Sequence, residues 1–150
     1  MRLVFLDAGP LGLLSNALGR PEADRCRRWV KDLTAAGVRV FVPEIADYEV
    51  RRELIRAAKA AGLRRLDQVK ATLEFAPINP DVMLKAAELW ADARKAGRPT
   101  AAPDALDGDC ILAATALLAA GPGDSPTVAT GNVGHLARFL DARPWGQITS

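Results

Sequence analysis

The chain has 150 residues, of which 49% are hydrophobic and 25% are charged, the usual balance of a single soluble domain. Its net charge of +2 is too small to indicate nucleic-acid binding by itself, and two cysteines do not indicate a disulfide framework. No apolar run approaches the roughly 20 residues of a membrane span, and the apolar run at the start is too short for a signal peptide. We therefore expect a cytoplasmic protein with one domain over residues 1–150.

Apolar runs rich in β-forming residues predict strands in this sequence, and apolar residues at helical spacing predict the helices between them. In the first half of the chain we expect a strand over residues 2–6, a turn over 8–10, a helix over 21–36, a strand over 38–42, and helices over 44–61 and 63–73. In the second half we expect a short edge strand over 74–78, a helix over 80–96, a loop over 97–103 and a helix around Asp109. A strand over 127–130, a helical turn and a short strand near 147–149 complete the expected order. Gly62 is expected to end the helix over 44–61. The inner side of the helix over 80–96 is expected to carry Met83, Ala86, Ala87, Trp90 and Ala93. Strands that alternate with helices pair in parallel, so the sequence predicts an α/β fold, a three-layer α/β/α sandwich with a central mainly parallel sheet.

Four polar residues fall at or near the expected ends of strands. Asp7 closes the first strand, Glu49 lies early in the helix after the second, and Asn132 follows the fourth. Asp109 lies in the first turns of the helix that leads to the fourth strand. Open parallel sheets bind ligands beyond the carboxyl ends of their strands, so these residues are candidates for a functional site. Asp7 and Asn132 are also compatible with simple turns.

Other acids lie close to these positions and leave part of the choice open. Asp104 and Asp107 are typical of the cap and first turn of the helix that they open. Glu44, at the first turn of its helix, suits the helix dipole. Glu44 and Glu53 offer the same chemistry as Glu49, so any of these neighbouring acids could contribute to the site.

Asp109 has the weakest structural explanation of the four candidates. It lies beyond the cap and shares a helical line with Leu112 and Ala116, so its carboxylate gives up hydration along an apolar stripe. Its own helix offers no lysine or arginine. Carboxylates that converge on a half-buried cleft repel one another, and a divalent cation offsets that repulsion. Oxygen ligands in a chain with one histidine, His135, suit Mg²⁺ or Mn²⁺ and not zinc.

The segments LDAGPL, VPEIADYEV, DCILAATA and TGNVGHLARF follow one another in this order along the chain. Together they resemble the motifs of PIN-domain nucleases, and among them the VapC-type toxins of bacterial toxin–antitoxin pairs, over essentially the whole chain. The resemblance places the family's first acid on Asp7, its glutamate on Glu49 and its third acid on Asp109. Thr130 and Asn132 occupy the positions of the last motif, near the metal.

This resemblance implies a PIN-like fold and hydrolysis of phosphodiester bonds, most often in RNA, that depends on Mg²⁺ or Mn²⁺. It implies that Asp7, Glu49 and Asp109 hold the metal, directly or through water, while Thr130 and Asn132 orient a water or the metal. Many family members have aspartate where Asn132 stands, so the sequence leaves open whether one or two metals bind. The resemblance also implies a cognate antitoxin as partner and a homodimer.

Arginines on the helix of Glu49 are the candidates for substrate binding. Arg51, Arg52 and Arg56 suit contacts to RNA phosphates, and they suit equally a solvated helix face with Glu–Arg pairs. His135 is expected in packing or at the surface, and as the single histidine it does not indicate a Ser–His–Asp hydrolase.

Two rival functions remain open at this point. One is a PIN-fold module that binds RNA or regulates but is catalytically weak, which Asn132 would reflect. The other is phosphotransfer through an acyl-phosphate on Asp7. Haloacid-dehalogenase-type enzymes carry a second aspartate two residues later, and Gly9 stands at that position here.

Overall fold

The computed structural model of the chain describes residues 1–96 and 103–150, without the side chains of residues 103–105. Five strands form one all-parallel sheet in the order β3–β2–β1–β4–β5. The strands are β1 (Arg2–Leu6), β2 (Arg39–Pro43), β3 (Glu74–Ala76), β4 (Ser125–Ala129) and β5 (Asp141–Arg143). The helices are α1 (Ala8–Leu14), α2 (Pro21–Ala35), α3 (Glu44–Arg56), α4 (Ala60–Thr72), α5 (Pro80–Lys95), α6 (Pro103–Ala119), α7 (Val133–Leu136) and the 3₁₀ helix η1 (Trp145–Gln147). The predicted α/β/α sandwich with a parallel sheet is confirmed, and β3 lies at an edge as predicted.

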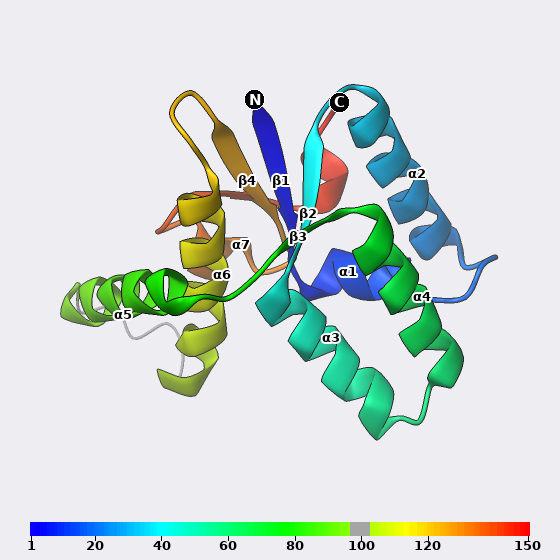
Figure 1. Ribbon diagram of the computed structural model, residues 1–150, viewed down its shortest axis with the longest axis horizontal. Helices are drawn as coiled ribbons and strands as arrows, with labels where there is room; N and C mark the ends of the chain where they lie inside the picture. Colours follow the sequence, from blue (N-terminus) through cyan, green and yellow to red (C-terminus); the bar gives the residue numbers. More distant parts are fainter. Residues whose placement is uncertain (97–102) are drawn as a thin grey trace.

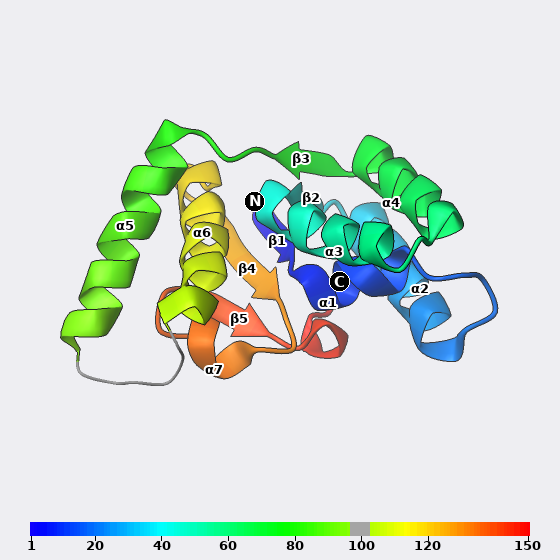
Figure 2. The same ribbon diagram turned by 90° about the horizontal axis from the view of Figure 1, so that it is seen from below.

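Both faces of the sheet are covered by helices because successive strand residues point to opposite sides. On β1, Val4 and Leu6 pack into a core with α1, α2, α3 and α4, whereas Leu3 and Phe5 pack into a second core with α6 and α7. α5 packs against α6 through a third apolar cluster and lies outside it, away from the strands (Figure 2). Among the described residues, no helix is long and apolar enough to cross a membrane.

Two pairs of packed helices extend past the carboxyl ends of the strands. α3 with α4 forms one pair and α5 with α6 the other, and Figure 1 shows them on either side of the end of β1. The chain passes from β1 to β2 on one side and later returns to β4 on the other side. The carboxyl end of β1 is therefore the point where the strand order reverses, between the two helix pairs.

The turn expected after Asp7 is wrong, because α1 begins at Ala8. The sequence AGP contains poor helix formers, which favours a turn by propensity alone. Asp7 caps the helix, Pro10 is tolerated in its first turn, and Leu11 and Leu14 are buried against the sheet. Burial of this helix in the core outweighs the local preference.

The expected end of a helix at Gly62 is also wrong, because Gly62 lies inside α4. The break falls between Arg56 and Ala60, where Ala58 adopts φ 54°. A Cβ on Gly62 would lie 2.8 Å from Cδ2 of Leu54, so the missing side chain lets α3 and α4 approach closely.

The strand expected near residues 147–149 is wrong. The last strand is β5, and the 3₁₀ helix η1 follows it. β5 has the sequence DAR with only Ala142 buried, so it offers no apolar run to detect. In α5, Val82 is buried but Met83 is 48% exposed, so the inner face is rotated from the expected one.

The remaining differences concern the second half of the chain. Ala87, expected on the inner side of α5, is exposed. α6 begins at Pro103, so Asp104 does not precede the helix as a cap, and its side chain lies outside the described residues. Residues 97–102 of the expected loop also lie outside them.

Candidate functional site

Asp7 and Thr130 lie next to each other where the strand order reverses. Asp7 follows β1 and its backbone N–H donates to Ala129 O of β4 (3.0 Å), which extends the parallel ladder by one residue. Thr130 follows β4 in the same way, and its Oγ1 donates to Asp7 Oδ2 at 2.7 Å. Asp7 Oδ1 accepts from the N–H of Ala8 at 2.7 Å, as the cap of α1. Both oxygens are thereby fixed in place, and each retains lone-pair capacity for a further contact.

Glu49 reaches this site from α3. α3 begins directly after β2, so Glu49 stands in the second turn, beyond the carboxyl end of a strand adjacent to β1. A Cβ on Gly108 would lie 3.6 Å from Glu49 Oε1, which shows how closely α6 approaches this carboxylate. Burial raises the pKa of Glu49, and the negative charges of Asp7 and Asp109 raise it further, against the opposing charge of Arg52.

Asp109 faces the same site from α6. Its side chain is 14% exposed, and within the described part of the chain its buried Oδ2 makes no hydrogen bond. Burial raises the pKa of Asp109 and the charge of Asp7 adds to the shift, while His135 and Arg138 oppose it. Three carboxylates from β1, α3 and α6 therefore act on one another electrostatically, although more than 40 residues separate each from the next.

Asn132 and His135 lie at the edge of this group of acids. The backbone N–H of Asn132 donates to Thr130 Oγ1 at 2.8 Å, so Thr130 bridges Asn132 and Asp7. The side-chain Nδ2 of Asn132 lies 3.0 Å from His135 Nδ1, and the same ring nitrogen lies 3.4 Å from Asp109 Oδ2. The side chain of Asn132 thus contacts the histidine.

His135 is the site residue that sequence reasoning did not place. It was expected in packing or at the surface, whereas the structure sets its ring against Asp109. Its position three residues after Asn132 puts both on one side of the short helix α7, which packs against α6. The three-residue spacing of Asn132 and His135 is visible in the sequence, but nothing in the sequence shows that α7 and α6 are neighbours.

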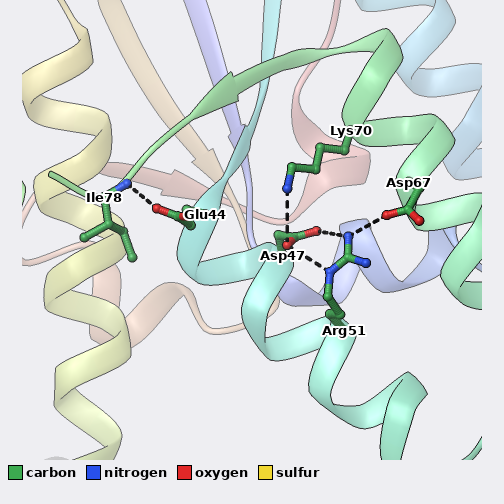
Figure 3. A network of polar contacts seen from close by, with 6 residues as sticks. All are labelled: Glu44, Asp47, Arg51, Asp67, Lys70 and Ile78. Carbon is green, nitrogen blue, oxygen red and sulfur yellow. Dashed lines mark hydrogen bonds and ion pairs between the residues drawn. The ribbon is translucent and has the colours of Figure 1, made fainter.

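The other acids that the sequence left open have different surroundings. Glu44 Oε1 accepts from the backbone N–H of Ile78 at 2.7 Å and so ties the start of α3 to the segment between β3 and α5 (Figure 3). Glu53 is exposed and forms an ion pair with Arg56 at 2.8 Å. Asp107 is exposed. Among the residues with described side chains, Glu49 is the glutamate whose pKa responds to Asp7 and Asp109.

The three arginines of α3 lie in unlike positions. Arg51 bonds to Asp47 and Asp67 and faces α4, as Figure 3 shows. Arg52 is exposed and its guanidinium lies 5.0 Å from the centre of the Tyr48 ring. Arg56 is exposed beside Glu53. Arg52 is the one whose charge acts on Glu49.

The donor chemistry of the site suits a hard divalent cation. In residues 1–96 and the described side chains after 105, no three His, Cys, Asp or Glu side chains are arranged to hold a metal ion as they stand. The acids nevertheless share one site, and Asp109 Oδ2 is a buried oxygen without a hydrogen bond. A divalent cation would satisfy this oxygen and offset the mutual repulsion, and carboxylate oxygens are the ligands that Mg²⁺ prefers.

Comparison with solved structures shows where this fold occurs. Eighteen chains match at a significant level. The chain matches the crystal structure of VapBC2 from Rickettsia felis bound to a DNA fragment from their promoter, with a TM-score of 0.72, 16% sequence identity, and coverage of 94% of this chain and 97% of that one. It also matches the structure of VapBC-1 from nontypeable Haemophilus influenzae, with a TM-score of 0.64, 18% identity, and coverage of 97% and 99%. At these identities the likeness establishes the fold.

Comparison at the level of sequence gives the family. No curated protein sequence matches the chain at a significant level. The family model of the PIN domain matches residues 4–130. This span contains Asp7, Glu49, Asp109 and Thr130, which the structure gathers at the end of β1. The chain is a member of the PIN domain family.

Proposed function

We propose that this protein is a metal-dependent endoribonuclease of the VapC type, the toxin of a toxin–antitoxin pair. The observation that carries the proposal is the electrostatic coupling of Asp7, Glu49 and Asp109 at the end of β1, where the buried Oδ2 of Asp109 makes no hydrogen bond to a described residue and has the His135 ring 3.4 Å away. PIN domains are generally nucleases, which supports phosphodiester hydrolysis. The likeness to VapBC structures supports the toxin class.

In this proposal Asp7, Glu49 and Asp109 hold Mg²⁺ or Mn²⁺. A bound cation of this kind lowers the pKa of water and stabilises negative charge on a phosphate. Thr130 holds Asp7 Oδ2 in a fixed orientation through its hydroxyl, and Asn132 supports Thr130 through its backbone N–H. Because Asn132 contacts His135 with its side chain, we propose that it positions these groups and is not itself a metal ligand.

The chain's own cations provide contact to the RNA backbone. Arg52 and Arg56 are exposed on the helix that carries Glu49, which suits phosphate binding next to the acids. Arg51 is 28% exposed and is shared by two aspartates, so its contribution to RNA binding is smaller than that of the other two.

The direct test is cleavage of labelled single-stranded RNA by the purified protein with Mg²⁺, with Mn²⁺, and with a chelator. We expect cleavage in both metals and none in the chelator. Asp7→Asn and Asp109→Asn should each lower the rate by at least about 100-fold, as expected when a group essential for charge stabilisation is lost. Asp32→Asn, the same change at an exposed residue of α2, should retain activity.

The rival function, a catalytically weak RNA-binding module, has a distinct outcome. RNA would bind, no metal would be taken up in calorimetry, and the wild-type protein would cut no faster than Asp7→Asn. That result would refute the nuclease.

The proposal extends to partners and place of action. We propose a cognate antitoxin as the protein partner, a homodimer as the assembly, and the cytoplasm as the location. Co-expression with a small reading frame, if one adjoins the gene, tests the antitoxin proposal, since the two products should co-purify with reduced RNA cleavage. If this protein purifies without the co-expressed product and its RNA cleavage is not reduced, the antitoxin proposal is contradicted.

A further inference from the structure

A cavity of about 440 Å³ opens between α1 and α3 on the side of Glu49. Gly9 and Gly12 of α1 and Asn16, just after this helix, form one wall, and Glu49, Leu54 and the turn before α4 form the other. We call it the α1–α3 cavity. Its volume is within the range of roughly 300–1,000 Å³ that small-molecule ligands occupy, and it shares the Glu49 wall with the proposed metal site.

The wall formed by α1 is open because two of its residues lack side chains. Gly9 and Gly12 are one helical turn apart on the same face, and a Cβ on either would meet nothing within 4 Å. Alanine at a helical position is more stable than glycine by roughly 0.5–1 kcal/mol. The sequence thus gives up helix stability at two positions where a side chain would fit, and the cavity stays open as a result.

The lining combines apolar walls with polar groups at the ends. Leu13 and Val50 contribute apolar surface, while Lys59 and the ion pair of Arg56 with Glu53 lie toward the α4 end. Asn16 contributes a side-chain amide that makes no hydrogen bond to any described residue. Apolar walls with a few placed hydrogen-bonding groups are typical of pockets that bind an unstacked nucleobase and read its edge.

The position of Asn16 is fixed from two sides. Arg27 of α2 donates to its backbone carbonyl oxygen, and Arg65 of α4 donates from Nε to the carbonyl oxygen of Ser15 at 2.8 Å. The end of α1 is therefore held to both neighbouring helices. A hydrogen-bonding side chain on such a fixed backbone loses little freedom when it binds, which is the condition for selectivity.

We infer that the α1–α3 cavity binds the nucleobase next to the phosphate that is cut, with Asn16 as the residue that reads its edge. This inference rests on the proposed ribonuclease function and adds the origin of its base preference. Lys59 and Arg56, the latter ion-paired to Glu53, lie on the same lining as Glu49, so the phosphate backbone of a nucleotide whose base enters the cavity would run between these cations and the acids of the proposed metal site.

The test fills the cavity without touching the acids. Gly12→Leu places a good helix former into the open space. Gly146→Leu is the matched control, because a Cβ there also meets nothing within 4 Å and Gly146 lies on η1, outside the cavity. Binding of labelled oligouridylate, oligocytidylate, oligoadenylate and oligoguanylate is measured by fluorescence anisotropy in a chelator, and cleavage positions are mapped on an RNA of mixed sequence.

We expect the wild-type protein and Gly146→Leu to prefer the same base. Gly12→Leu should bind the preferred oligonucleotide about tenfold more weakly, the size expected for loss of one bound base, and should cut with little preference. Asn16→Ala should reduce the preference by itself, so it serves as a second variant should Gly12→Leu fail to fold.

The outcomes separate the two proposals. RNA cleavage by the wild type, with unchanged affinity and preference in folded Gly12→Leu and in Asn16→Ala, would overturn the base pocket and leave the nuclease intact. It would assign the cavity to another ligand, such as a segment of a protein partner. Absence of metal-dependent cleavage in the wild type would overturn both.

Discussion

At the scale of the residue, Asp109 places a carboxylate where its negative charge receives little stabilisation when no metal is bound. Its side chain is 14% exposed, its Oδ2 makes no hydrogen bond to a described residue, and the charge of Asp7 acts against its ionisation. Glu49 is in a similar situation: burial and the charge of Asp7 raise its pKa, and Arg52 offsets part of the shift, as His135 and Arg138 do for Asp109. The protein thus keeps desolvated carboxylates at this site at the expense of its own stability, which supports the proposed cation site.

Asp109→Asn should stabilise the metal-free protein at about pH 7, by roughly 1 kcal/mol, because it removes a desolvated and repelled charge. The folded pKa of Asp109 is raised above its ordinary value of 3.8, so its stabilising contribution is complete below that pH and is lost as the pH rises through the folded pKa. The difference between variant and wild type should thus be near zero at about pH 4 and largest near neutrality. Urea unfolding followed by circular dichroism measures it.

Two comparisons make this prediction specific to the site. Asp32→Asn, at an exposed position of α2, should show no comparable dependence on pH. Mn²⁺ should raise the melting temperature of the wild type but not of Asp109→Asn. A variant that is less stable than the wild type at every pH would contradict our account of Asp109.

At the scale of the element, α3 is held to α4 by charges as well as by the close contact at Gly62. Asp47 is buried, and its carboxylate bonds to Arg51 at 2.9 and 3.2 Å, with Lys70 at 3.9 Å (Figure 3). Arg51 also bonds to the exposed Asp67 of α4 at 2.8 Å. Since α3 carries Glu49, this network fixes the helix that brings one acid to the site.

Arg51→Ala should destabilise the protein by about 2 kcal/mol, because it leaves the buried carboxylate of Asp47 with only the distant Lys70. Asp67→Asn should cost less than about 1 kcal/mol, because its carboxylate is 63% exposed. Chemical unfolding of both variants provides the comparison. Adding Asp47→Asn to Arg51→Ala should recover part of the loss, and equal losses in the two single variants would count against a buried charge as the cause.

The elements that the sequence predicts well are those whose burial leaves a periodic pattern. β1 and β2 are apolar on both faces, so their short runs stand out, and α2 shows its buried residues at helical spacing. α1 and β5 were missed because α1 begins with AGP and β5 is the polar tripeptide DAR. Their stability comes from packing and pairing with elements distant along the chain, which a local pattern does not contain.

The candidate site follows the same division. Asp7, Glu49 and Asp109 are candidates from the sequence because each is a charge on or beside an apolar element, and the strand-end rule for parallel sheets supplies the expected meeting point. His135 was not assigned to the site, since its contact with Asp109 depends on how α7 packs against α6. The α1–α3 cavity was not predicted either, because an open space between two helices has no sequence pattern of its own.

At the scale of the whole molecule, the two cysteines lie in apolar clusters on the two sides of the sheet. Cys26 is buried in the core of α1 to α4, and Cys110 lies in the cluster between α5 and α6. Burial raises the pKa of the Cys26 thiol to about 12 and that of Cys110 to about 11. Both thiols are therefore neutral and shielded in the folded protein.

We expect neither thiol to react with a thiol-specific disulfide reagent at about pH 8 until the molecule opens, because the thiolate is the reactive form. Both should react at once in urea above the unfolding midpoint. Burial of the neutral Cys26 thiol contributes fully to the stability of the folded protein below the thiol's ordinary pKa of 9.0. This contribution is lost as the pH rises toward about 12, the pKa of the thiol in the folded protein. Rapid labelling of one cysteine in the native protein would show that its side of the sheet opens independently.

The central strand of the sheet has a consequence for how this protein is made. β1 is synthesised before the other four strands of this sheet, but one of its two neighbours, β4, begins only at Ser125. Asp7 acquires its hydroxyl contact only once Thr130 has been synthesised. A polypeptide that stops before these residues has β1 with one bare edge and Asp7 without the Thr130 contact, so the group of acids at the end of β1 can assemble only after translation has passed that point.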